Sequence, residues 1–168
     1  MGHQALIRAA REIADQEHLK VFVHTYEVSP YEVITGKKVC LLTDNTEKER
    51  LLREYGADEV IYSRFDQEIM KMTGRFFFEE ILLKTFSPRV IVAGQDHRFG
   101  NKGDTDTVKM RMLCDEHNIR LVLIPPVMDQ QGTRISSSEI RNCLKNGDLA
   151  KAEQMLGHQY SKRGSMGV

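Results

Sequence analysis

The sequence of 168 residues has few cysteines, no long apolar run and no surplus of charge of either sign. Cys40, Cys114 and Cys143 are an odd number, lie far apart and show no metal-ligand spacing, so we expect buried, reduced thiols in a cytoplasmic protein. No apolar run approaches bilayer length and no signal-peptide core opens the chain, so we expect neither a membrane span nor export. Lysine plus arginine equals aspartate plus glutamate, at 24 each, so the totals do not indicate a nucleic-acid partner.

The residues that are present indicate one folded α/β domain. Apolar residues make up 40% of the chain and charged residues 29%, as in ordinary globular domains. Helical spacing alternates along the chain with short strand patterns. We expect helices at 3–17, from the capping box Thr46-x-x-Glu49 to Gly56, and at 66–86, 105–117, 137–146 and 148–156; we expect strands at 19–26, 59–62, 89–93 and 120–124. This order predicts a doubly wound parallel sheet with right-handed crossovers.

Two details belong to this fold prediction. The aromatic run 76–78 lies at helical spacing and is expected in the core. The chain opens with a helix, whereas a doubly wound fold usually opens with a central strand whose turn leads into the first helix. Either the protein lacks that strand or the given chain starts after it.

The strongest local signal is the segment 135–141, Ile-Ser-Ser-Ser-Glu-Ile-Arg. Ser136 and Glu139 form a capping-box pattern that predicts a helix start. Its first turn would present free backbone N–H groups, the hydroxyls of Ser137 and Ser138 and, one turn further, the guanidinium of Arg141. Such donors suit a phosphate group. The alternative is a well-capped helix with an unrelated surface arginine.

Two weaker signals lie elsewhere. Gly94, Asp96, Arg98, Phe99 and Gly100 follow a buried strand, at the end of a parallel sheet where ligands bind. The alternative is a polar loop with two turn glycines.

At the start of the chain, Gly2 and His3 could meet phosphates, or could simply be a terminus. Four other histidines, His18, His24, His117 and His158, share no metal-ligand spacing and receive no role, and we expect no protein metal site.

Taken in order, five segments carry a family resemblance over nearly the whole chain: GHQALIRAA, TYEVSPYEV, LLTDNTEKERLLREYGADEV, VAGQDHRFGNKGD and RISSSEIRNCLKNGDLAKAEQMLGHQY. Together they resemble the adenylyltransferase module of bacterial bifunctional riboflavin kinase/FAD synthetases. ISSS-x-IR alone would indicate only the wider HxGH nucleotidylyltransferase superfamily, whose fold is Rossmann-like. The GQDHRFG loop and the LLT…EK segment make the flavin branch more specific.

The resemblance implies transfer of AMP from ATP to FMN, giving FAD and pyrophosphate, with Mg²⁺. It implies that His3 and Arg141 are catalytic and that ATP is held by Gly2, His3, Gly94, Asp96, Ile135, Ser137, Ser138 and Arg141. It further implies that flavin is held by Asp96, Arg98, Phe99 and Gly100. Small-molecule substrates are therefore the expected partners, without nucleic acid or membrane.

The chain departs from the family pattern at three places. The first strand and the first histidine of HxGH are missing, and Met1 stands where the variable residue of that motif would be. Ser29 replaces a family histidine, and the given chain stops where the family pattern would continue into the kinase domain. We therefore expect a nucleotidyltransferase domain over 1–157, with weak or no activity in this form, and a tail over 158–168 where a riboflavin kinase domain would begin. Riboflavin phosphorylation is not expected of this chain.

Two other functions stay open at this point. The chain could transfer a nucleotide to another phosphate acceptor, of the pantetheine-phosphate or nicotinate-mononucleotide type. It could also be a non-catalytic fragment that binds nucleotide or flavin.

Overall fold

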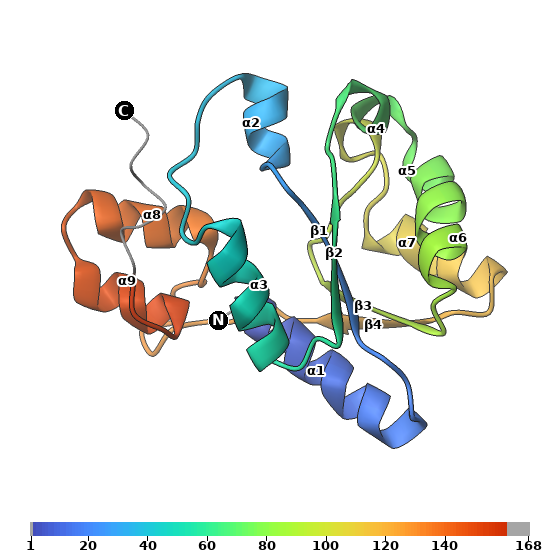
Figure 1. Cartoon of the computed structure of the whole chain (residues 1–168), viewed down its shortest axis with the longest axis horizontal. Coiled ribbons are helices and arrows are strands. Elements are labelled where there is room, and N and C mark those ends of the chain that lie inside the picture. The colour runs from blue at the N-terminus through green and yellow to red at the C-terminus, as the bar shows by residue number, and fades with distance from the viewer. Residues whose placement is uncertain (1, 161–168) are drawn as a thin grey trace.

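Four short parallel strands lie at the centre of the protein (Figure 1). The structure is a computed structural model and describes residues 2–160. The strands are β1 (Phe22–Tyr26), β2 (Glu59–Ser63), β3 (Val90–Gly94) and β4 (Arg120–Ile124). They form two separate pairs: β1 pairs with β2 in the register Phe22 to Glu59, and β3 pairs with β4 in the register Val90 to Arg120. A parallel pair needs a crossover connection, and helices supply it in both cases.

Helices cover both faces of the strands. The helical elements before β3 are α1 (Gly2–Glu17), α2 (Pro30–Thr35), α3 (Asn45–Glu54), α4 (Gln67–Lys71), α5 (Gly74–Phe76), the π-helix η1 (Phe77–Leu83) and α6 (Lys84–Phe86). Ile7 of α1 and Leu52 of α3 form one apolar cluster with Ala57, beside β1 and β2. A second cluster joins Phe78 of η1 to β3, β4 and α7 (Thr107–Glu116). The apolar stripes of these helices therefore hold each strand pair from outside.

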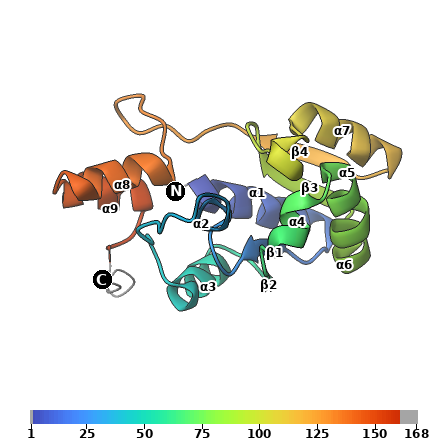
Figure 2. The same ribbon diagram turned by 90° about the horizontal axis from the view of Figure 1, so that it is seen from above.

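The C-terminal helices form a unit of their own. α8 (Ser137–Lys145) and α9 (Leu149–Leu156) pack against each other. Their shared core contains Ile135, Ile140, Cys143, Ala152, Met155 and Leu156, with Leu42 packed against it. Both views place this pair on the opposite side of the strands from α5, α6 and α7, with the N-terminal end of α1 between (Figures 1 and 2). The segment between β4 and α8 thus carries the chain across the molecule.

The fold class and all four strands are confirmed, and several local predictions are wrong. Residues 66–86 are not one helix, because Met72 adopts an extended backbone (ψ 134°) and Thr73 starts a new helix by accepting a hydrogen bond from the Phe76 N–H. The cap of α3 is Asp44, whose carboxylate accepts from the Glu47 N–H at 2.7 Å, and Thr46 lies inside the helix.

Burial also corrects two expectations. Phe77 and Phe78 are buried, but Phe76 is 51% exposed. Cys114 and Cys143 are buried free thiols, whereas Cys40 is an exposed one.

Two further predictions concern a membrane span and the C-terminal tail. Among residues 2–160, no helix is both long and apolar enough to cross a membrane. The predicted tail over 158–168 falls mostly outside the described residues, and the domain boundary stays a prediction.

Candidate functional site

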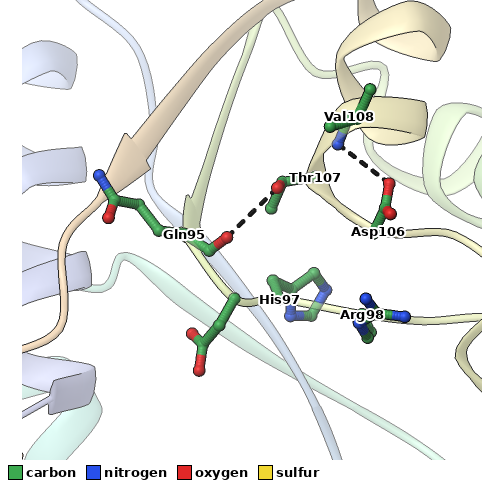
Figure 3. A pocket seen from close by; sticks show the side chains of 7 residues that line it. Gln95, His97, Arg98, Asp106, Thr107 and Val108 are labelled. Atoms are coloured by element: carbon green, nitrogen blue, oxygen red, sulfur yellow. Dashed lines mark hydrogen bonds between the residues drawn. The ribbon is translucent and has the colours of Figure 1, made fainter.

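The loop after β3 lines a small, open pocket. Its turn closes with the His97 N–H donating to the Gly94 carbonyl at 3.0 Å, and the Thr107 hydroxyl donates to the Gln95 carbonyl at 3.2 Å. The pocket measures about 210 Å³ and is lined by Gln95, Asp96, His97, Arg98, Asp106, Thr107 and Val108 (Figure 3). Ligand sites usually exceed about 300 Å³. The pocket can therefore hold part of a nucleotide-sized molecule at most.

Phe99 and Gly100 are built into the packing at the end of this loop. The Phe99 ring lies 6.0 Å from that of Phe77 and stacks on His97 at 5.7 Å. Gly100 has φ +81°, and a Cβ there would lie 2.4 Å from the backbone nitrogen of Gly74. These contacts give both residues a structural reason to be present. Their contact with flavin stays a prediction.

An ion pair ties this loop to the start of α8. The carboxylate of Asp96 accepts from the guanidinium of Arg134, and this hydrogen bond lowers the pKa of Asp96. Arg134 stands two residues before the cap of α8. The sequence reasoning did not single out Arg134, because nothing local links it to a residue 38 positions earlier. The ion pair thus joins the loop after β3 to the residue immediately before the predicted segment 135–141.

The first turn of α8 has the predicted geometry. Ser136 is the cap and its hydroxyl accepts from the Glu139 N–H at 3.2 Å, while Ser137 and Ser138 are exposed. Arg141 donates its Nε to the Cys40 carbonyl at 2.8 Å. Among the described residues, its two terminal nitrogens have no protein partner. They are therefore available to an anion.

Ile135 has a different place from its neighbours. Its side chain is only 6% exposed and belongs to the core of α8 and α9, and its N–H donates to the Val127 carbonyl at 2.8 Å. Its predicted contact with ATP can therefore come from its carbonyl alone.

At the start of α1, His3 keeps part of its surface open to solvent although protein surrounds much of its ring, while its neighbour Gln4 is fixed. The Gln4 side-chain amide donates to the Tyr55 hydroxyl at 2.7 Å and to the Leu156 carbonyl at 3.0 Å, which ties α1 to α3 and α9. Removal of water from the ring by surrounding protein, together with the positive charges of the chain's amino group and of Lys48, lowers the pKa of His3. Gly2 begins the same helix.

Lys48 is a candidate site residue that the sequence reasoning missed. It lies in α3, and its ammonium reaches the carboxyl end of β1, where it donates to the Thr25 hydroxyl and the Tyr26 carbonyl. The LLT…EK segment contains this lysine, but it served only as part of the resemblance. A lysine in a charged helix gives no local signal that its end is fixed.

One cluster of possible metal ligands lies away from these segments. Single ligand atoms of Glu79, Glu116 and His117 come within 4.8 Å of one another. Arg75 already donates to both carboxylates, at 2.7 to 2.9 Å. The cluster is thus an ion-pair network around a guanidinium, which does not suit a cation.

The described site segments offer cations and helix donors to an anionic ligand. Arg141 and Lys48 have no carboxylate within ion-pair distance in the described part of the chain, whereas Arg50, Arg53 and Arg75 all do. A helix N-terminus with free donors adds to the attraction for phosphate.

Comparison with known proteins agrees with this chemistry. The model of one protein family, described as FAD synthetase, matches residues 1–139. The bifunctional riboflavin kinase/FMN adenylyltransferase of Escherichia coli strain K12 is 32% identical over 164 residues, which cover 97% of this chain and 52% of that protein. An FAD synthetase of Listeria monocytogenes is 28% identical over 164 residues, which cover 95% of this chain and 65% of that protein.

A solved structure is similar over the same length. The crystal structure of a macrolide-efflux protein from Streptococcus pneumoniae has a TM-score of 0.84 and 28% identity, and the match covers 94% of this chain and 52% of that one. The chain therefore spans about half the length of several of the proteins that it matches. Because the family match extends over most of the sequence, the chain belongs to the FAD synthetase family.

Proposed function

We propose that the chain transfers AMP from ATP to FMN, giving FAD and pyrophosphate. The observation that carries this proposal is the first turn of α8, in a chain of the FAD synthetase family. It combines a Ser136 cap, two exposed hydroxyls and the unneutralised terminal nitrogens of Arg141. This arrangement supports binding of the ATP phosphates by Ser137, Ser138 and Arg141.

The proposed reaction needs no covalent intermediate on the protein. A phosphate oxygen of FMN attacks the α-phosphorus of ATP, the bond from that phosphorus to the bridging oxygen breaks, and pyrophosphate leaves with the electron pair. Catalysis then consists of aligning two anions and stabilising the charge that develops between them. In the proposal, His3, Gly2 and Arg141 act on the ATP phosphates, and the loop Gly94–Gly100 contacts flavin and nucleotide.

Mg²⁺ enters this proposal as part of the MgATP substrate. Mg²⁺ usually keeps several waters and is held by substrate phosphates with one or two carboxylates. Asp96, the carboxylate of the predicted loop, is paired with Arg134. The phosphates would therefore supply most of the ligands, in line with a site that is rich in cations.

The proposal also covers the flavin substrate and the cellular compartment. FMN is taken up as a substrate, and no riboflavin phosphorylation is proposed for this chain. The buried free thiols Cys114 and Cys143 suit a reducing compartment and support a cytoplasmic location.

The test is to incubate the purified chain with FMN, ATP and Mg²⁺ and to follow FAD by chromatography. We expect slow formation of FAD, and a further loss of rate of about 10² to 10³ for Arg141→Ala. Lys145→Ala, in the exposed last turn of the same helix, is the matched control and should leave the rate unchanged. Equal rates for Arg141→Ala and the unaltered chain would contradict the phosphate role of α8. Flavin binding without any FAD would leave the non-catalytic alternative in place.

A further inference from the structure

Lys48 holds a positive charge at the carboxyl end of β1. Its half-buried side chain crosses from α3, and Nζ lies 3.2 Å from the Thr25 hydroxyl and 3.1 Å from the Tyr26 carbonyl. The ammonium also lies over the ring of Tyr62, 5.0 Å from its centre. Two hydrogen bonds and a ring fix the ammonium in one place. Ligands of open α/β sheets bind at this end of the strands.

None of these contacts neutralises the charge. The acidic residues of α3 are already paired within the helix: Glu47 and Glu54 with Arg50, and Glu49 with Arg53. Among the described residues, no carboxylate lies within ion-pair distance of Lys48. Burial lowers the pKa of Lys48, and no carboxylate nearby offsets that effect.

A second basic group lies nearby, at the N-terminus of a long helix. The charge of Lys48 contributes to lowering the pKa of His3 at the start of α1. The N-terminal turn of this 16-residue helix adds partial positive charge to the same region. The positive charge of Lys48 therefore disfavours a second positive charge on His3. A doubly charged oxyanion would remove that repulsion and take up the free N–H of Lys48.

We infer that Lys48 binds a phosphate group of the substrates, at a position separate from the phosphate-binding turn of α8. The inference rests on the proposed function for the identity of those substrates. The phosphate belongs either to FMN or to ATP, and both offer the same oxyanion. A charge-assisted hydrogen bond of this kind raises the affinity for the phosphate-bearing ligand by roughly ten- to hundred-fold.

Separate binding titrations of the full chain test this inference. FMN and riboflavin binding are followed by quenching of flavin fluorescence, and MgATP binding by calorimetry without FMN. We expect Lys48→Met to lower the affinity for FMN or for MgATP by roughly ten- to hundred-fold. The affinity for riboflavin, which lacks a phosphate, should stay unchanged. Lys48→Arg should restore most of the affinity. Lys20→Met, at the other end of β1, is the matched control and should behave as the unaltered chain.

The outcomes separate the two phosphate sources and the two claims. If only FMN binding is weakened, Lys48 contacts the phosphate of FMN. If only MgATP binding is weakened, Lys48 contacts the triphosphate. Unchanged binding of both, or an equal loss for riboflavin, overturns the inference and leaves the proposed function standing. If the unaltered chain binds neither FMN nor MgATP, the proposed function fails and the inference fails with it. Lys48→Gln, which keeps hydrogen-bonding atoms, replaces Lys48→Met if the latter does not fold.

Discussion

Gly100 shows how single residues hold the candidate loop in place. Its φ of +81° disfavours any residue with a Cβ, and that Cβ would lie 2.2 Å from an Asp104 carboxylate oxygen and 2.4 Å from the Gly74 nitrogen. Positive φ alone costs about 1 kcal/mol for alanine, and a backbone clash adds to it. We therefore expect Gly100→Ala to lower the free energy of unfolding by about 2 to 4 kcal/mol, measured by urea denaturation.

Gly132 provides the control for this prediction. It also has a positive φ, of +78°, but nothing lies within 4 Å of a Cβ built there. Gly132→Ala should therefore cost only the conformational part, about 1 kcal/mol. Equal losses for the two variants would show that the contact between Gly100 and Gly74 does not matter for stability.

At the same scale, the sequence predicted single segments better than their connections. The helix start at Ser136 follows from residues three positions apart, and the structure confirms it. The pairing of Asp96 with Arg134 and the placement of Lys48 beside Thr25 depend on how distant segments pack. No spacing rule expresses those contacts, so the candidate site could be predicted only in parts.

Among the elements, α8 offers the clearest separation of stability from binding. The Ser136 hydroxyl accepts from the Glu139 N–H, which would otherwise lack a partner at the helix start. We expect Ser136→Ala to lower the free energy of unfolding by about 1 kcal/mol, measured by thermal or urea denaturation.

Ser138→Ala is the companion variant within the same turn. Its hydroxyl is exposed and makes no hydrogen bond to protein in the described part of the chain. Its stability should stay within about 0.5 kcal/mol of the unaltered protein, while its affinity for MgATP falls. A stability loss in Ser138→Ala as large as that in Ser136→Ala would argue against this division of roles.

The elements also show why helix boundaries were harder to predict than strands. β4 is bounded as predicted because the four apolar positions after Arg120, all buried or half-buried, suit a covered strand. The predicted helix over 66–86 breaks at Met72, whose carbonyl accepts a hydrogen bond from the Asn101 N–H at 2.8 Å. That bond comes from a distant loop and overrides the local helical spacing.

For the molecule as a whole, Asp58 links three parts and couples stability to pH. Its carboxylate accepts from the Val21 N–H at 2.7 Å and from Arg11 of α1 at 2.9 Å, and these bonds lower the pKa of Asp58. A depressed folded pKa stabilises the protein above the unfolded value of about 3.9 and loses that contribution as pH falls through the folded value. The molecule should therefore become less stable below about pH 4.

Asp58→Asn tests this source of acid sensitivity. We expect this variant to be less stable at pH 7 by up to about 1 kcal/mol; the effect is small because Asp58 is partly exposed. We also expect the variant to lose less stability than the unaltered protein between pH 5 and about pH 3. Denaturation at a series of pH values measures both effects. Asp115→Asn, an exposed aspartate of α7, should match the unaltered protein; an identical pH profile for Asp58→Asn would reject the role of Asp58.

The two strand pairs are joined by side chains and not by a ladder. Among residues 2–160, β1 pairs only with β2 and β3 only with β4. Phe77 of η1 connects the pairs, since its ring lies 5.9 Å from His24 on β1 and 6.0 Å from Phe99 after β3.

Because β1 and β3 each pair on one side only in the described part of the chain, alternate amides on their unpaired sides lack a strand partner. Residue-resolved hydrogen exchange should show alternating fast and slow amides along both strands, with uniformly slow exchange in the centre of α7 as the reference. Uniform protection along β1 or β3 would instead mean that a further strand pairs with that edge and that the two pairs form one sheet.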